Sequence, residues 1–367
     1  MRVFLLGATP SFDLAKHSTL AGKLTATGGN SGNQVIAYGL LKTFQHSAVA
    51  WDYSIGPDRV NAEFDVIVVA AANFLFPAFD LGGMADFIAR TKLPVVMVGL
   101  GAQSNDPTNP ALALKEGTVR LVKVVSERSA LIGVRGEYTA RVLKHMGIDN
   151  VQITGCPSYY MPGKAGYQIR NDGFNAQSPI AIHASRDVFK HSFDADKMKA
   201  VVLDLYLEAA RRKGIFVAQT EVDEINLAES KDQPDRDKAL TQLMSVFKDV
   251  GHPDIMKPWF ESGMRVYWTV PEWTEAMKKY PFVVGTRFHG TMAALHGGTP
   301  AVCICHDSRT TEMCEFLGIP NVALKAIDKL DVAAIRANAD LAGLTKRYGE
   351  LYPKYEAFLK ANGLTPV

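Results

Sequence analysis

The sequence is poor in cysteine, and the cysteines that it has form no recognisable pattern. They are Cys156, Cys303, Cys305 and Cys314. Small disulfide-stapled domains carry many cysteines in a short chain, and structural zinc sites carry closely spaced cysteine pairs. Neither pattern occurs here. We therefore expect reduced thiols in the core, and we expect no metal site.

Long apolar runs and an excess of one charge are also absent. No apolar stretch approaches the ~20 residues that a membrane-spanning helix needs. The N-terminal run RVFLLG is more typical of a first strand than of a signal peptide. The chain has 40 Lys and Arg against 38 Asp and Glu, which gives a formal net charge of +2. We expect no integral membrane segment, no nucleic-acid partner and a cytosolic location.

What the sequence does contain is a regular alternation of apolar runs and helical patterns. The runs predicted to be strands are RVFLLG, FDVIVVAAA, LPVVMVGLG, LIGVR and VQITG in the first half, and PIAIHA, IFVAQT, RVYWTV, PFVVG and AVCIC in the second. Continuous apolar runs with helices between them indicate parallel sheets that are covered on both faces. The predicted fold class is therefore α/β, with two Rossmann-like doubly wound domains that face a cleft.

The chain is long for one domain, at 367 residues. Residues 161–179 are rich in Gly, Pro, Asn and Gln, which is typical of a linker. We expect an N-terminal Rossmann-like domain over 1–160, a C-terminal one over 180–345 and an amphipathic C-terminal helix over 346–367. Ligands of such folds lie at the carboxyl ends of the strands, here in the cleft between the domains.

The stretch PFVVGTRFHG places an arginine and a histidine directly after a predicted strand. We expect a loop over 286–289 and a helix over 290–297, although the stretch also fits a plain strand–helix junction. An anion near Arg287 and His289 would meet the guanidinium and the free N–H groups of the helix together. His289 can titrate near neutral pH and act as an acid or a base. Arg309, after the next predicted strand, is expected near the same cleft.

The glycine-rich loop TGGNSGN precedes a helical pattern. Gly29, Asn30 and Asn33 lie in or beside it, and the helix N-terminus that follows suits an anion. It is neither GxGxxG nor a Walker loop, because the spacing differs and no lysine follows. A flexible turn whose Asn side chains cap the helix explains the same residues equally well.

Two further loops follow predicted strands and carry polar side chains. After LPVVMVGL, Gly101 lets backbone approach a ligand closely and Gln103 offers a neutral polar contact, although loop-building explains both. After PIAIHA, Arg186 can hold a carboxylate or phosphate through paired hydrogen bonds. An ion pair of Arg186 with its neighbour or with a helix terminus is the alternative use.

Metal binding and nucleophilic catalysis are the competing chemistries. His289, His306 and Asp307 are potential metal ligands, but no HxxxH or paired-carboxylate motif places them at ligand spacing. No GxSxG motif occurs, so a serine nucleophile of that type is not predicted. His296 lies in a small-residue packing run, where a core histidine is the favoured interpretation.

Taken in order, these motifs resemble the polysaccharide pyruvyl transferase family. The strongest likeness is VVGTRFHGTMAALHGGTPAVCICHDSRTTEMCEFLGIP, with its strand, Arg-x-His, small-residue helix and Gly-x-Pro-strand. VGLGAQS and IGVRGEYTARVLKHMGIDNVQITGCP support it, and the likeness runs from the GGNSGN loop to about Pro320. The family implies a GT-B-like pair of domains and transfer of the pyruvyl unit of phosphoenolpyruvate to sugar hydroxyls, usually as a ketal.

The resemblance implies a site without a cofactor. We expect His289 and Arg287 to be the catalytic residues, with His289 as the general acid for the methylene carbon. We expect Arg287, together with Arg186 and Arg309, to hold the phosphoenolpyruvate anion. The candidate substrate-binding residues are Arg186, Arg309, Gly29, Asn30, Asn33, Gly101, Gln103, Thr286 and Gly290. The implied partners are phosphoenolpyruvate and a lipid-linked or nucleotide-linked sugar, on the acceptor side of the N-terminal domain. Peripheral association with the inner membrane face stays open, as does the oligomeric state.

The chain departs from the family pattern at three positions. Asn33 and Cys156 stand where the family often has Asp, and Arg309 stands where Lys is common. The two missing carboxylates bear on acceptor recognition and on activity. Two alternatives stay open. One is a GT-B glycosyltransferase with a nucleotide-sugar donor, since the same architecture and an arginine-lined phosphate site would serve a diphosphate; Glu312 or Glu315 would then hold the ribose. The other is a non-catalytic sugar- or anion-binding relative, for which the missing carboxylates are the hint.

Overall fold

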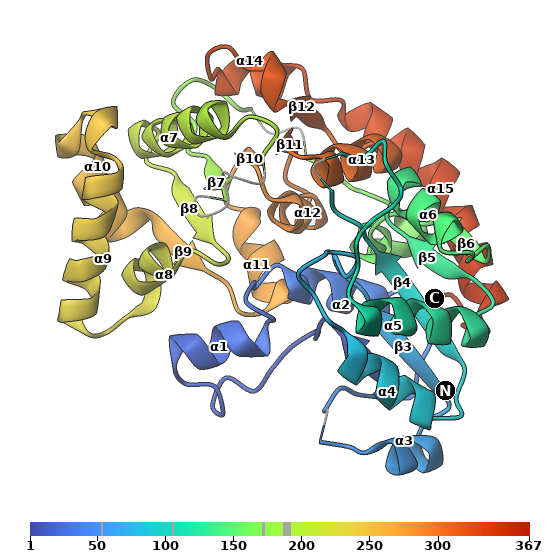
Figure 1. The fold of residues 1–367 in the computed structure, drawn as a ribbon. Coiled ribbons are helices and arrows are strands. Elements are labelled where there is room, and N and C mark those ends of the chain that lie inside the picture. Colours follow the sequence, from blue (N-terminus) through green and yellow to red (C-terminus); the bar gives the residue numbers. More distant parts are fainter. Residues whose placement is uncertain (53, 105, 171–172, 186–191) are drawn as a thin grey trace.

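The computed structural model describes the whole chain except residues 53, 105, 171–172 and 186–191. Within this described part, the chain forms two parallel sheets of six strands each (Figure 1). The strand order is β2-β1-β3-β4-β5-β6 in the first sheet and β12-β11-β10-β7-β8-β9 in the second. Each order reverses direction once, between β1 and β3 and between β7 and β10, as in doubly wound folds. The predicted fold class is confirmed.

The strands follow the apolar runs closely. The first sheet contains β1 (Arg2–Gly7), β2 (Ala48–Ala50), β3 (Val66–Ala70), β4 (Val95–Leu100), β5 (Ile132–Val134) and β6 (Val151–Ile153). The second contains β7 (Ala181–His183), β8 (Ile215–Ala218), β9 (Met264–Val266), β10 (Val283–Gly285), β11 (Ala301–Cys305) and β12 (Asn321–Ala323). Every predicted run overlaps a strand, although RVYWTV shares only Arg265 and Val266 with β9. The edge strands β2 and β12 were not predicted, because they are short and only partly buried and lack an apolar run.

Helices connect the strands and cover the sheets (Figure 1). Those of the first half are α1 (Leu20–Ala26), α2 (Asn33–Leu41), α3 (Pro57–Glu63), α4 (Gly82–Arg90), α5 (Glu116–Arg128) and α6 (Glu137–His145). Those of the second half are α7 (Ala195–Arg211), α8 (Val222–Glu229), α9 (Gln233–Val246), α10 (Pro253–Gly263), α11 (Val270–Met277), α12 (Phe288–His296), α13 (Ser308–Leu317), α14 (Val332–Ala337) and α15 (Leu341–Ala361).

Two helices begin earlier than the sequence predicted. The helix expected over 290–297 begins at Phe288, so His289 lies in its first turn and not in the preceding loop. The C-terminal helix, expected over 346–367, begins at Leu341 because the carboxylate of Asp340 accepts a hydrogen bond from the third-residue N–H and caps it. It ends before Gly363, whose φ of 74° suits a helix stop.

The two sheets share a continuous apolar core. Strands β3 and β4 are buried along their whole length, as Val-rich runs covered on both faces should be. One core cluster runs from Val3 in β1 through Val283 in β10 to Phe358 in α15. The last helix therefore packs on the first sheet although it follows the second, and both chain ends lie there (Figure 1). The exact domain boundaries stay a prediction.

Among the helices of the described residues, none combines the length and the apolar character needed to cross a membrane.

Candidate functional site

A cavity of about 550 Å³ lies between the two sheets, at the carboxyl ends of their strands. Its walls are the loops after β3, β4 and β5 on one side, and the loops after β7, β8, β10 and β11 on the other. The predicted residues that line it are Asn30, Gln103, Thr286, Arg287, His289 and Arg309. The switch point of the second sheet, between β7 and β10, opens into this cavity, which is the position where doubly wound folds bind ligands.

Asn33, Gly29 and Gly290 were predicted to bind substrate but do not line the cavity. Asn33 donates a hydrogen bond to the carbonyl of Thr27 at 3.0 Å and ties the glycine loop together. Gly29, with φ of 78°, has open space where a Cβ would lie. Gly290 packs against the imidazole of His183, which a Cβ would meet at 2.5 Å. Asn30, by contrast, lines the cavity while its Oδ1 accepts from the N–H of Gly32 at 2.8 Å.

Gly101 and Arg186 are the remaining predicted substrate-binding residues. Gly101 lies behind the lining, where a Cβ would come within 2.9 Å of Arg135 Cδ and 3.3 Å of Asn73 Oδ1. A glycine at 101 therefore lets two cavity side chains pack across the backbone. Arg186 lies outside the described residues, so its predicted contact with an anion stays a prediction.

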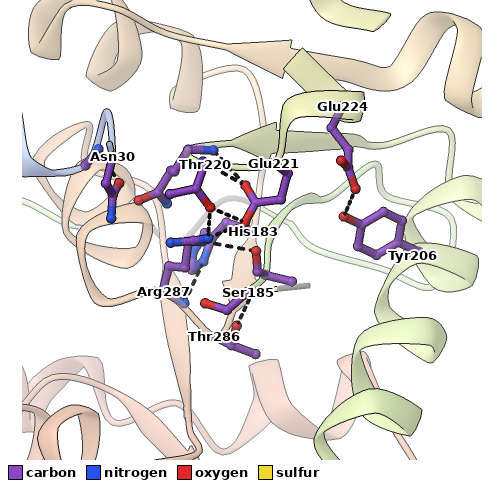
Figure 2. Close-up of polar contacts among 12 residues, drawn as sticks. Asn30, His183, Ser185, Tyr206, Thr220, Glu221, Glu224, Thr286 and Arg287 are labelled. Carbon is purple, nitrogen blue, oxygen red and sulfur yellow. Dashed lines mark hydrogen bonds and ion pairs between the residues drawn. The ribbon is translucent and has the colours of Figure 1, made fainter. Parts of the chain in front are cut away.

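Arg287 lies at the switch point, and its side chain is already engaged (Figure 2). Its Nη2 pairs with the carboxylate of Glu221 and also donates to the hydroxyl of Thr220, and its Nε donates to the carbonyl of Ala184 at 3.1 Å. Its backbone N–H donates to Nδ1 of His183 at 3.2 Å. These contacts fix the turn into α12 and offset the arginine charge.

Glu221 is the residue in this network that sequence reasoning missed. Its side chain is fully buried, and it accepts backbone N–H bonds from Gln219 at 2.9 Å and Thr220 at 3.1 Å. Burial opposes its ionisation, but the charge of Arg287 and these hydrogen bonds outweigh burial and lower its pKa. The signal was the end of IFVAQT, a predicted strand followed at once by a glutamate.

His289 lies in the first turn of α12, between the two sheets. Its Nε2 is 3.5 Å from the thiol of Cys156, which lies after β6 and is fully buried. Burial, together with the charges of Arg135 and Arg309, lowers the pKa of His289 well below its ordinary value. The imidazole is therefore neutral at pH 7 in this arrangement, which differs from the near-neutral titration that the sequence predicted.

Two arginines from opposite sheets face the cavity. Arg135, at the end of β5, is 4% exposed and donates to the carbonyls of Gly99 at 2.8 Å and Ala71 at 3.5 Å. No carboxylate among the described residues pairs with it. Arg309, in the first turn of α13, donates from Nη2 to Asp307 at 3.1 Å, while its Nε is buried with no partner among the described residues. Sequence reasoning missed Arg135, although it ends the predicted strand LIGVR much as Arg186 follows PIAIHAS.

The first N–H groups of α12 add to this positive side. No side chain among the described residues caps that helix, whereas Asp307 caps α13 through the N–H of Thr310 at 2.7 Å. Open N–H groups at a helix N-terminus attract anions. The cavity thus combines two guanidinium groups with a helix N-terminus, an arrangement that suits a small polyanion.

Potential metal ligands gather elsewhere. Cys303, Cys305 and Cys314 lie with their sulfur atoms within 4.8 Å of one another, because β11 places two of them on one face and α13 packs the third against it. They are buried free thiols, as the sequence predicted. His306 and Asp307 line the cavity but belong to no such group among the described residues.

The comparisons with known proteins identify a family. A family model described as polysaccharide pyruvyl transferase matches residues 30–308. No curated protein matches the sequence significantly.

Solved structures match over nearly the whole chain but at low identity. S. aureus MnaA with UDP is 13% identical, with a TM-score of 0.45, over 100% of this chain and 99% of that one. Anabaena Alr3699/HepE with UDP and glucose is 11% identical, with a TM-score of 0.49, over 98% and 99%. A UDP-N-acetylglucosamine 2-epimerase from Rickettsia bellii is 14% identical, with a TM-score of 0.44, over 98% and 96%. These likenesses concern the fold alone.

Proposed function

The chain belongs to the polysaccharide pyruvyl transferase family, and on that basis we propose that it transfers a pyruvyl group from phosphoenolpyruvate to sugar hydroxyls, forming a ketal. The setting that we propose is surface or exopolysaccharide biosynthesis. The observation that carries the proposal is the position of Arg135 and Arg309, which face one cavity from opposite sheets beside the open N-terminus of α12.

The charges of the site fit a donor with more than one anionic group. Phosphoenolpyruvate carries a phosphate and a carboxylate, so it needs two cationic or N–H-rich subsites. Around the cavity, three arginines face two carboxylates, Asp307 and Glu221, which leaves one positive charge in excess among the described residues. Because Glu221 neutralises the charge of Arg287, we propose that Arg135 and Arg309 contact the donor directly. Arg186, which we predict to assist, follows β7 along the chain but lies outside the described residues.

The chemistry begins with a proton for the methylene carbon of phosphoenolpyruvate. A neutral imidazole is a poor acid. Burial is the main cause of the low pKa of His289, and the charges of Arg135 and Arg309 lower it further; an anion between these arginines would offset their contribution and raise the pKa. His289 would then take up a proton as the donor binds and deliver it to the methylene, which becomes the methyl group. The role of Arg287 is to hold the turn that carries His289.

The remaining steps need no reagent other than the donor and the sugar. The carbon left by protonation has oxocarbenium character, and a sugar hydroxyl adds to it and releases its proton. The C–O bond to phosphate then breaks, a second hydroxyl of the same sugar closes the ring, and its proton leaves with the phosphate. One donor and one diol therefore give one ketal and one inorganic phosphate.

The nucleotide-sugar alternative has less support in the cavity. It required a glutamate placed to hold a ribose, and Glu312 instead accepts a hydrogen bond from the backbone N–H of Tyr138 at 2.6 Å, at the start of α6. Glu315 is exposed and does not line the cavity. No observation among the described residues favours a nucleotide over phosphoenolpyruvate.

The decisive experiment compares donors directly. Calorimetric titrations with phosphoenolpyruvate and with UDP-sugars, followed by a phosphate-release assay with a panel of lipid-linked and nucleotide-linked sugars, test donor and reaction separately. We expect phosphoenolpyruvate to bind, and an acceptor-dependent release of phosphate that is lost in His289→Ala. Binding of UDP-sugar alone would overturn the proposal, and a fully active His289→Ala enzyme would overturn the role of His289.

A further inference from the structure

The loops after β3 and β4 form a wall of the cavity that differs from the opposite wall. Its lining side chains are Asn73, Phe76, Phe79 and Gln103. None of these described residues is charged, whereas the wall from the second sheet carries Arg287, Asp307 and Arg309. Arg135, from the loop after β5 on the same side, belongs with the arginines of the anion site. The cavity therefore has an ionic part and an aromatic and amide part, which suits two ligands of different chemistry.

We propose that this wall binds the acceptor as an uncharged pyranose ring, stacked on Phe79 and hydrogen-bonded by the Asn73–Gln103 amide pair. This inference rests on the proposed function only where it identifies the bound sugar as the acceptor of the reaction. The sugar site itself stands on the contacts of this wall.

The aromatic pair offers a ring face to the cavity. Phe76 and Phe79 contact each other edge to face, with ring centroids 5.3 Å apart and planes at 67°. The backbone N–H of Phe79 donates to the carbonyl of Phe76 at 3.0 Å, which fixes the turn between them. Phe79 is 46% exposed and lines the cavity. The C–H face of a pyranose would cover that apolar ring, as aromatic rings are covered in binding sites.

The amide pair beside the rings has unused hydrogen-bonding groups. Nδ2 of Asn73 donates to Oε1 of Gln103 at 2.5 Å. Oδ1 of Asn73 is buried and has no partner among the described residues. Whichever way the two amides are turned, their mutual bond leaves one acceptor and one donor unused. Neighbouring hydroxyls of a sugar each donate and accept, so they match the amide groups that this mutual bond leaves unused.

The wall is held rigidly before any ligand arrives. The N–H of Gly101 donates to Ala72 at 2.9 Å, the N–H of Leu75 to Gly101 at 3.0 Å, and the N–H of Gln103 to Leu75 at 3.1 Å. These bonds join the two loops side by side. A preorganised wall loses little conformational entropy when a ligand binds. Gly101 makes the arrangement possible, since a Cβ there would contact Asn73 and Arg135 together.

The absence of charge on this wall selects the class of sugar. A hexuronate or sialic-type acceptor needs a cation within reach of its carboxylate, because a buried unpaired charge is costly. The cavity's arginines lie at the anion subsite and would be occupied by the donor. A neutral hexose or N-acetylhexosamine fits the aromatic and amide wall without that cost.

The test measures sugar binding apart from turnover. The probes are methyl β-glucopyranoside and methyl β-galactopyranoside as neutral rings and methyl β-glucopyranosiduronate as the charged one, followed by saturation-transfer NMR. We expect the neutral rings to bind and the uronate to bind at least about tenfold more weakly. Phe79→Ala should raise the neutral-sugar Kd about tenfold, which is the range of one aromatic stacking contact.

Matched variants separate stacking from folding. Phe79→Trp should keep binding, Phe79→Leu should weaken it by up to the tenfold expected for Phe79→Ala, and Phe193→Ala, which removes an exposed phenylalanine outside the cavity lining, should leave it unchanged. Equal binding of uronate and neutral sugar, no binding of either neutral ring, or a Kd unmoved by Phe79→Ala would each overturn the sugar site. Failure of phosphoenolpyruvate to bind, with Phe79-dependent sugar binding intact, would overturn the donor proposal and leave the sugar site standing.

Discussion

Glu221 and Arg287 form a buried ion pair that bridges the ends of two strands, β8 and β10, across the strand β7 that lies between them. Figure 2 shows the guanidinium beside Glu221 and Thr220. Its Nε also donates to the carbonyl of Ala184, directly after β7. A pair that spans three strands holds the switch point of the second sheet in one geometry. It also means that the carboxylate of Glu221 already offsets the charge of Arg287, the residue that precedes α12 and His289.

Removing the carboxylate of this pair should destabilise the fold. Glu221→Gln leaves the Arg287 charge buried and uncompensated, which costs about 3–5 kcal/mol for pairs of this kind. Urea denaturation at pH 7 measures the loss. The double variant Glu221→Gln/Arg287→Gln is the control and should recover most of it, because no unpaired charge remains. A loss below about 1 kcal/mol in the single variant would contradict a buried, ionised pair.

Stability should fall on mild acidification. Burial lowers the pKa of His183 from 6.5 to about 4 and that of His296 to about 3. The unfolded chain takes up these protons near pH 6.5 while the folded chain does not, so the unfolded state binds more protons below that pH and the free energy of unfolding decreases. The depressed pKa of Glu221 acts in the same direction, below its unfolded value of 4.5.

The measurement is the free energy of unfolding between about pH 7.5 and pH 4.5, the range set by these histidines. We expect a plateau above pH 7 and a decline below about pH 6.5. The variant His296→Phe, which keeps a ring against Tyr167, should reduce the slope by up to one proton. Unchanged stability at pH 5 would show that these histidines are protonated in the folded state.

The two cavity arginines should differ in how they tolerate substitution. Arg309 is partly exposed and binds Asp307, so Arg309→Lys should keep most of the affinity for phosphoenolpyruvate, whereas Arg309→Ala should weaken it about 10- to 100-fold, the range of charged hydrogen bonds. Arg135 is buried and donates to two carbonyls, so Arg135→Lys should already lose affinity because an ammonium cannot reproduce that fork. Calorimetric titration distinguishes the pair, and equal behaviour of both lysine variants would be inconsistent with this assignment.

Binding of phosphoenolpyruvate should be accompanied by proton uptake at His289. The charges of Arg135 and Arg309 help to lower the pKa of its imidazole, and a bound polyanion between them would reverse that effect. Calorimetry at pH 7 in buffers of different ionisation enthalpy counts the protons. We expect uptake in the wild type and a loss of that uptake in His289→Gln, with binding retained. Identical uptake in the variant would assign the proton to another group, such as His306.

Much of the fold could be predicted from the sequence because local patterns carry it. Val-rich runs that end in glycine or a polar residue mark buried parallel strands, and each predicted run overlaps one. The edge strands β2 and β12 escaped because a short, half-exposed strand leaves no apolar pattern. The start of α12 was placed too late because the N-cap, Arg287, is not one of the residues that usually cap helices.

The sequence alone determined the α/β class, the family likeness and the concentration of polar residues after strand ends, since these depend on residue types and short-range spacing. It could not determine which strand ends meet. The order of strands in a sheet is a long-range property. Only the tertiary structure therefore decided that Glu221 neutralises Arg287, that Arg135 and Arg309 line one cavity, and that Cys156 lies against His289. Those contacts set the charge and the pKa values of the site, and with them the chemistry that we propose.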